Sequence, residues 1–246
     1  MNYELGIIYI ATGKRYLAEA VHSANSAKKL MPDIPISLWI DRNTDKNVNI
    51  NHNNCFDSIN MIHDPKYSFL DKMRPLFETK YEKTLFVDTD TYFLDSIYEI
   101  STLLDQFEIA CVHAPNRICS WEKNFKNHNV PICFPQLNTG VIAYRKNERV
   151  MQFFKEWERI YIKQLNQTPS PPHDQPAFRE ALYFSNLNLT ILPPEYNLRA
   201  DFPGYTGGSC HVKIIHGRDP YLSQAKSLAN DTSHILFNFR ELNNST

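Results

Sequence analysis

The chain of 246 residues is 42% apolar and 13% aromatic, which suffices for a substantial hydrophobic core and excludes a chain that is disordered throughout. Its 26 basic residues are balanced by 27 acidic ones, so no overall positive field exists to attract nucleic acid or an anionic membrane. No apolar run approaches the ~20 residues of a membrane-spanning helix, and residues 1–4 lack the pattern of a signal peptide. We therefore expect a cytoplasmic protein with no membrane span and no nucleic-acid partner.

The first half of the sequence alternates between strand and helix patterns. Short apolar runs predict strands at 5–11, 36–40, 56–62, 83–87 and 108–113. Apolar residues at helical spacing predict helices at 17–31, 69–80 and 96–107. Strands that alternate with helices build a mostly parallel sheet with helices on both faces. We therefore predict an α/β fold whose ligand lies at the carboxyl ends of the strands.

The second half is less regular. The pattern predicts a strand at 138–144, a long amphipathic helix at 150–165 and a helix that starts near Asp174. A mostly apolar segment at 189–192, a Gly-rich loop at 204–208 and a short strand at 212–215 follow. Neither a repeat nor a linker divides the chain, so we expect one domain over 1–246.

Two aspartates, Asp88 and Asp90, follow the apolar run 83–87 directly. Two carboxylates at the end of a hydrophobic strand repel each other unless a cation or hydrogen-bond donors compensate. Carboxylate oxygens suit Mg²⁺ or Mn²⁺, so the pair is a candidate metal site. The alternative is that either aspartate simply caps a turn or a helix.

Four stretches of the chain, in this order, carry a resemblance to a known family: Lys83–Thr91, Leu137–Ile142, His173–Phe178 and Lys213–Gly217. Together they resemble the nucleotide-sugar-dependent glycosyltransferases of the GT-A fold, in particular family eight, the glycogenin and bacterial galactosyltransferase group. The resemblance implies a GT-A fold with a mixed, mostly parallel sheet and a Rossmann-like N-terminal half. Residues 1–114 would then be the nucleotide-binding half and residues 115–246 the sugar and acceptor half.

The resemblance also implies a metal site. In this family an Asp-x-Asp pair and a later histidine hold a divalent ion that bridges the donor's diphosphate, which corresponds here to Asp88, Asp90 and His216 with Mn²⁺ or Mg²⁺. Such an ion absorbs the charge that develops on a departing diphosphate. The alternative for His216 is an ordinary core or surface histidine.

Further residues are implied at the donor. Lys72, or alternatively Arg74, corresponds to a basic residue at the nucleotide or phosphate, although a solvated helix charge is the other interpretation. Candidate contacts with the uracil, ribose or phosphates are Tyr9, Ala11, Thr12, Thr89 and Arg218. The donor is therefore expected to be a nucleotide sugar, most simply a UDP-sugar.

The transferred sugar is expected beside two of the motifs. The resemblance places Asn138, Thr139 and Gly140 next to it, where an amide offers both donors and acceptors to hydroxyl groups. It places Asp174 on a sugar hydroxyl and Gln175 near the anomeric carbon, as the candidate catalytic pair. Alternatively, Asn138–Gly140 is only a turn, and Asp174 also suits a helix N-cap. The Gln175 correspondence favours retention of configuration, although inversion stays open.

One departure from the family concerns the last motif, because the family often ends with His-x-x-Gly-x-x-Lys-Pro-Trp, whereas Gly217 and Arg218 follow His216 at once. This leaves the second phosphate contact undecided. We nevertheless expect a hexosyltransferase acting on a glycan, protein or small-molecule acceptor. The alternatives are a catalytically silent nucleotide-sugar or glycan-binding protein on this fold, and a haloacid-dehalogenase-like phosphohydrolase, whose D-x-D-x-[TV] motif is broken by Tyr92.

Overall fold

A computed structural model describes residues 4–45, 54–116, 130–167, 173–202, 204–207, 210–229 and 234–237 of the chain. A seven-stranded sheet, which we call the main sheet, runs through its centre in the order β3-β2-β1-β4-β7-β6-β8. The strands of the main sheet are β1 (Leu5–Ala11), β2 (Ile36–Asp41), β3 (Ser58–Ile62), β4 (Lys83–Val87), β6 (Ile109–His113), β7 (Leu137–Arg145) and β8 (Leu189–Ile191). All neighbouring strands are parallel except that β7 is antiparallel to both β4 and β6. The sheet is therefore mixed and mostly parallel, as predicted.

A second, smaller sheet lies beside the first, and we call it the side sheet. Its strands, in the order β5-β11-β9, are β5 (Thr91–Phe93), β11 (Ile214–His216) and β9 (Leu198–Arg199). Strands β10 (Gly204–Gly207) and β12 (His234–Phe237) form a separate antiparallel pair. The side sheet thus joins the segment after β4 to segments near the end of the chain.

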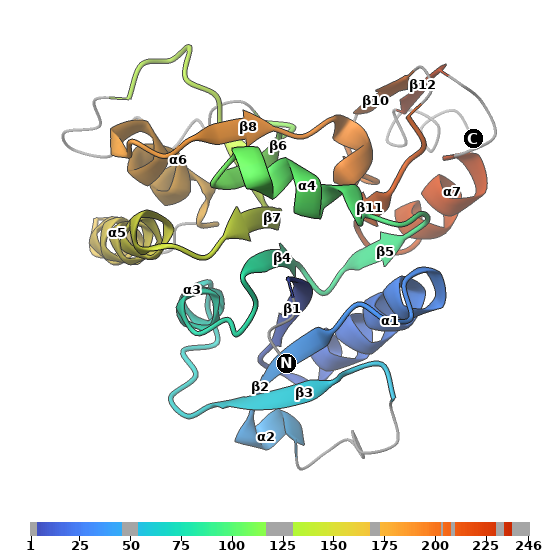
Figure 1. Cartoon of the computed structure of the whole chain (residues 1–246), viewed down its shortest axis with the longest axis horizontal. Helices are drawn as coiled ribbons and strands as arrows, with labels where there is room; N and C mark the ends of the chain where they lie inside the picture. Colours follow the sequence, from blue (N-terminus) through green and yellow to red (C-terminus); the bar gives the residue numbers. More distant parts are fainter. Residues whose placement is uncertain are drawn as a thin grey trace.

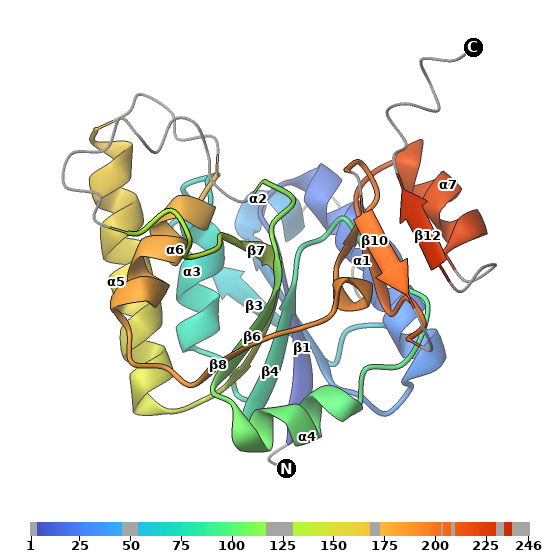
Figure 2. The ribbon, with the colours of Figure 1, turned by 90° about the horizontal axis from the view of Figure 1, so that it is seen from above.

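Helices cover both faces of the main sheet (Figure 1). The helical segments are α1 (Lys14–Leu30), α2 (Arg42–Asp45), α3 (Leu70–Phe77), α4 (Glu99–Gln106), α5 (Glu148–Leu165), α6 (Gln175–Phe184), α7 (Tyr221–Leu228) and the 3₁₀ turn η3 (Pro194–Tyr196). Helices α3, α5 and α6 lie on one face, and α1, α4 and the side sheet lie on the other (Figures 1 and 2).

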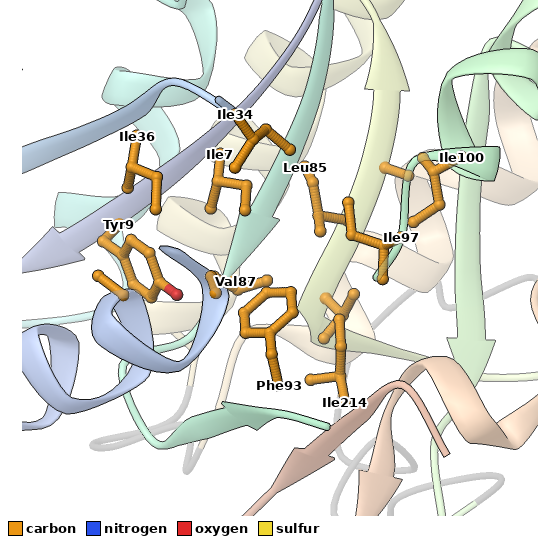
Figure 3. Close-up of a cluster of buried hydrophobic side chains, with 14 of the residues drawn as sticks. Ile7, Tyr9, Ile34, Ile36, Leu85, Val87, Phe93, Ile97, Ile100 and Ile214 are labelled. Atoms are coloured by element: carbon orange, nitrogen blue, oxygen red, sulfur yellow. The ribbon is translucent and has the colours of Figure 1, made fainter. Parts of the chain in front are cut away.

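The alternation of side chains along β4 explains why there are two cores. Phe86 packs with the α3, α5 and α6 face, whereas its neighbours Leu85 and Val87 pack with the α1 and α4 face. On that second face the cluster extends to Phe93 of β5 and Ile214 of β11, and Figure 3 shows Phe93 between Val87 and Ile214. The side sheet is therefore anchored to the main sheet by apolar packing.

Most elements predicted from the sequence are confirmed, with differences at their ends. The predicted helix 69–80 is shorter, because α3 ends at Phe77, where the Glu78 N–H turns back to the Pro75 carbonyl. The stretch predicted as a Gly-rich loop contains strand β10 instead. Strand β5 and helix α7 are additions, because a three-residue strand and a polar helix leave little periodic signal. Within the part of the chain that the structure describes, every helix is too short or too polar to span a bilayer.

Candidate functional site

A cavity of about 600 Å³ lies where the main sheet meets the side sheet. Among the residues predicted to act, those that line it are Thr12, Lys72, Asp88, Thr89, Asp90, Asn138, Thr139, Asp174, Gln175, His216 and Arg218. The cavity thus gathers side chains from the carboxyl end of β4, from β7, from β11 and from the start of α6. The predicted placement of the ligand at the strand ends is consistent with this geometry.

The pairing of β5 with β11 brings the two aspartates to the histidine. Thr91, directly after Asp90, lies opposite His216 in this antiparallel ladder. The His216 Nε2 atom lies 3.3 Å from Asp90 Oδ1 and 3.8 Å from Asp88 Oδ2. One potential ligand atom from each of the three residues lies within 4.8 Å of the others. The predicted convergence of Asp88, Asp90 and His216 is therefore present in the fold.

Gly140 explains how these three side chains fit together. A Cβ atom at this position would lie 2.2 Å from His216 Cε1 and 2.7 Å from Asp88 Oδ2. The Gly140 carbonyl accepts a hydrogen bond of 2.7 Å from the Asp88 N–H, which continues the β4 to β7 ladder by one residue. Gly140 therefore forms the floor under the triad, where only a residue without a side chain fits.

The donor set fits a divalent cation. Mn²⁺ binds both carboxylate oxygens and imidazole nitrogen readily, whereas Mg²⁺ favours the carboxylate oxygens. Burial raises the pKa of Asp88, although Lys72 and His216 act against the rise. Burial acts in the same direction on Asp90, but His216 and Arg218 outweigh it and hold the pKa of Asp90 well below its ordinary value. The site thus contains a carboxylate, Asp90, that already pairs with the guanidinium of Arg218.

Lys72 is buried and does not lie on a solvated helix surface. Its Nζ atom lies 2.6 Å from Asp174 Oδ2 and donates to the Thr139 carbonyl and hydroxyl at 3.3 and 3.2 Å. The rings of Phe69, Phe86 and Trp157 surround it at 5.3 to 5.7 Å. Burial lowers the pKa of Lys72, but Asp174 and Asp88 outweigh this effect and raise it overall. Lys72 is therefore a charged group held inside the cavity wall.

Asp174 occupies the expected N-cap position, but its side chain has other partners. Its side chain makes no capping hydrogen bond at the start of α6. Both of its oxygens turn inward instead, toward Lys72 and toward the Thr139 hydroxyl at 2.9 Å, while its backbone carbonyl accepts from Trp157 Nε1 at 3.2 Å. Asp174 is thus the N-cap residue of α6, as expected from the sequence, but its carboxylate binds Lys72 and Thr139 instead of the helix N–H groups.

Arg218 and Gln175 both have partners that the sequence did not indicate. Arg218 donates to both oxygens of Glu19 at 2.7 and 2.9 Å and lies 2.9 Å from Asp90 Oδ2. Glu19 also accepts from the Thr89 hydroxyl at 3.0 Å. Gln175 accepts from the amide of Gln136 at 3.0 Å. Helix α1 is thus tied to the loop of the Asp pair through one carboxylate.

Three predicted residues lie outside the cavity lining: Tyr9, Ala11 and Gly140. Tyr9 is fully buried, and its hydroxyl forms a 2.8 Å hydrogen bond with Ser23 of α1. Ala11 is fully buried at the end of β1. Thr12, the next residue, is the member of this segment that reaches the cavity.

The sequence patterns did not indicate two residues at the site: Arg199, which lines the cavity, and Asn197, which contacts His216. Arg199 lines the cavity and lies opposite His216 in the β9 to β11 pairing. Asn197 accepts from or donates to the His216 ring at 2.9 Å. Both belong to a segment without periodic pattern or motif, so only the side sheet itself reveals them.

Comparisons with protein-family models and with curated protein sequences give no match. Among solved structures the chain is similar to the galactosyltransferase LgtC, solved in complex with donor and acceptor sugar analogues. The match has 13% sequence identity and a TM-score of 0.56, and it covers 92% of this chain and 97% of that one. At this identity the likeness concerns the fold: the chain adopts the GT-A fold that its four ordered motifs predict.

Proposed function

We propose that this chain is a metal-dependent glycosyltransferase that moves a hexose from a nucleotide diphosphate sugar, most simply a UDP-sugar, to a hydroxyl group of an acceptor with retention of configuration. The observation that carries the proposal is the convergence of Asp88, Asp90 and His216 at the edge of a cavity large enough for a small-molecule donor. The GT-A fold raises the prior for this activity without fixing it.

Asp88, Asp90 and His216 would hold Mn²⁺ or Mg²⁺. When bound, the ion supplies Lewis-acid stabilisation of the negative charge that develops on the departing nucleoside diphosphate. Arg218 lies at Asp90 with its guanidinium partly exposed to the cavity, so it is placed to donate to a phosphate oxygen. Lys72 adds a second fixed positive charge in the wall.

The hexose is oriented by the polar groups between α6 and β7. Thr139 and Lys72 hold both carboxylate oxygens of Asp174, so this carboxylate is rigid and remains able to accept from a sugar hydroxyl through its other lone pairs. Gln175, the next residue, is anchored by Gln136 and is proposed to act near the anomeric carbon. The acceptor hydroxyl forms the new bond at that carbon as the bond to the diphosphate breaks, and its proton passes to a diphosphate oxygen.

The first experiment measures binding and turnover in the same protein. Calorimetry with UDP, with and without Mn²⁺, is expected to show metal-dependent binding, and a screen of UDP- and GDP-sugars is expected to show donor hydrolysis or transfer. Binding without any turnover favours a silent binder. Release of phosphate from a phosphomonoester favours a phosphohydrolase.

A matched pair of variants tests the metal assignment. Asp90→Ala is expected to abolish metal-dependent UDP binding while the protein stays folded. Asp95→Ala removes a carboxylate on the same connection that pairs instead with Lys213, so it is expected to leave UDP binding unchanged. Equal binding by both variants would refute the metal site. The configuration of the product's anomeric centre, read by proton NMR, tests retention separately.

A further inference from the structure

A chain of buried hydrogen bonds leads from the main sheet to the ring of His216. The Gly140 N–H donates to Asn138 Oδ1 at 2.8 Å. Asn197 Nδ2 donates to the same oxygen at 2.9 Å, and the other end of this amide, Asn197 Oδ1, lies 2.9 Å from His216 Nδ1. Asn138, Asn197 and His216 are all at most 3% exposed. The side chain of Asn197 therefore connects β7 to the metal-ligating ring.

The direction of every bond in this chain follows from its first member. A backbone N–H is only a donor, so the atom of Asn138 that faces Gly140 is the carbonyl oxygen. An oxygen can only accept, so the atom of Asn197 that faces it is the amide nitrogen. The opposite end of Asn197 is then its oxygen, which requires a hydrogen atom on His216 Nδ1. The Gly140 N–H thus fixes the orientation of both amides and requires the hydrogen on Nδ1 of His216.

The position of Asn197 in the fold explains why it can hold the ring. Its backbone N–H bonds to the Pro194 carbonyl at the end of η3, and the next residue, Leu198, starts β9 opposite Ile215. Asn197 is thereby fixed beside β11 by two backbone constraints. A buried polar side chain without partners costs about 1–3 kcal/mol, so the fully bonded arrangement is strongly favoured over one with a flipped amide.

We propose that Asn197 is a positioning residue that fixes His216 as the tautomer with hydrogen on Nδ1, so that the lone pair of Nε2 faces Asp88 and Asp90. Second-layer groups of this kind orient metal-ligating histidines and set their basicity. The metal-binding purpose of the ring rests on the proposed function, whereas the hydrogen on Nδ1 follows from the hydrogen bonds of the metal-free protein.

The same chain defines what Asn138 offers to a ligand. Asn138 lines the cavity and its side-chain oxygen already accepts from Gly140 and Asn197, so the group that it can offer to a ligand is its amide nitrogen, a donor. Asn138 therefore links the expected sugar position to the metal ligand through a single intermediate residue, Asn197.

The tautomer is measured directly on the wild-type protein. Long-range proton–nitrogen NMR spectra of ¹⁵N-histidine-labelled protein, recorded without metal at alkaline pH, show which ring nitrogen of each histidine carries hydrogen. The His216→Gln spectrum identifies the signal among the 9 histidines of the chain. Hydrogen on Nδ1 of His216 supports the proposal, and hydrogen on Nε2 overturns it.

Two substitutions separate positioning from mere packing. Asn197→Leu removes the acceptor and is expected to weaken Mn²⁺ binding, titrated alone and with UDP, by about 10–100-fold. Asn197→Asp keeps an oxygen facing Nδ1 and is expected to lose less Mn²⁺ affinity than Asn197→Leu, since carboxylates serve the same purpose behind metal-bound histidines. Its second oxygen replaces the amide that donates to Asn138, so this variant is also expected to have a lower free energy of unfolding than wild type. Tyr196→Phe is the matched control, because the neighbouring hydroxyl bonds to Glu99, away from the ring.

The outcomes distinguish this inference from the function on which it rests. Equal Mn²⁺ affinity in Asn197→Leu and wild type, or equal losses in the Leu and Asp variants, overturns the positioning role. If Asn197→Leu does not fold, Asn197→Asp and the wild-type tautomer decide. Wild-type protein with hydrogen on Nδ1 and no affinity for Mn²⁺ refutes the proposed function but supports the tautomer assignment.

Discussion

The main sheet and the side sheet differ in how they are built and in what they contribute. The main sheet consists of seven strands, of which β1, β2, β4, β6 and β7 are buried along most of their length. The side sheet consists of three strands of two or three residues from distant parts of the sequence, yet it supplies His216 and Arg199 to the cavity. Stability and site geometry are therefore provided largely by different parts of the fold, and they meet where β4 continues into β5.

This division predicts that substitutions act differently on the two sides of the junction. Substitutions behind the main sheet are expected to change the free energy of unfolding with little effect on metal binding. Substitutions where the sheets meet are expected to change both. The following variants test this contrast.

The largest effect is expected for Lys72→Met. It leaves the buried Asp174 carboxylate without its cation, which typically costs about 3–5 kcal/mol of unfolding free energy. Mn²⁺ binding is expected to persist, because the variant removes a positive charge near Asp88 and Asp90 and so does not oppose a cation. Urea denaturation followed by tryptophan fluorescence and calorimetry with Mn²⁺ measure the two quantities.

The double variant Lys72→Met with Asp174→Asn provides the control for Lys72→Met. Neutralising the stranded carboxylate is expected to recover about half of the lost stability. No recovery would show that Lys72 stabilises the protein through its contacts with the three aromatic rings and not through Asp174.

Gly140→Ala probes the junction itself. The new methyl group would overlap His216 and Asp88, so Mn²⁺ binding is expected to fall at least about 100-fold, together with an overpacking cost of about 1–3 kcal/mol. Gly6→Ala is the matched control, because its methyl group would lie 2.4 Å from the buried Tyr81 ring, within the main sheet. It is expected to lose similar stability with unchanged Mn²⁺ affinity, and equal losses of affinity would contradict the division between the two sheets.

The same contrast decides how much of the fold could be predicted from sequence. Strands such as β1 and β4 are visible because a strand buried on both faces is apolar along most of its length. The reversed direction of β7 leaves no such mark, because strand direction depends on the connection and not on the side chains. Strand β5 has three residues, too few for any period to show.

The candidate site shows the same limits. Asp88 and Asp90 could be predicted because they follow a clear strand, and His216 because a motif surrounds it. Asn197 has neither advantage, since its role arises from the pairing of β9 with β11, segments that lie far from β7 in the sequence. Tyr9 is expected at the donor because it lies near the end of a predicted strand. In the structure its side chain faces α1 and is buried in the core, because successive side chains of a strand point to opposite faces of the sheet.

Glu19→Gln tests the link between α1 and the loop of the aspartate pair. Its carboxylate accepts from Arg218, Thr89 and Arg15, so the neutral amide is expected to cost about 1–2 kcal/mol of unfolding free energy. Arg15→Gln removes only the exposed partner and is expected to cost no more than about 0.5 kcal/mol. Urea denaturation measures both, and equal costs would show that Arg218 does not need Glu19 to hold its place.

A smaller effect than that of Glu19→Gln is expected for Asp57→Asn, at the residue that precedes β3 and away from the cavity. The Asp57 carboxylate accepts from the Ile36 N–H at 2.8 Å and pairs with Lys28 at 2.9 Å. The amide oxygen of asparagine can still accept from Ile36, so only the charge interaction is lost. Because the Asp57 side chain is 44% exposed, the expected cost at neutral pH is below about 1 kcal/mol.

The pH dependence of the stability lost in Asp57→Asn shows whether the loss comes from the charge of Asp57. Burial opposes the shift, but Lys28 and the Ile36 N–H lower the pKa of Asp57 in the folded protein. A carboxyl group with a lowered folded pKa stabilises the fold above its unfolded pKa of about 3.9 and loses this contribution as the pH falls through the folded value. The stability difference between wild type and Asp57→Asn, from urea denaturation at pH 7 and below about pH 3, should therefore shrink toward zero. A stability difference that persists in acid would assign the effect to packing. A change in Mn²⁺ affinity in Asp57→Asn would show that a charge at the far side of the main sheet affects the metal site.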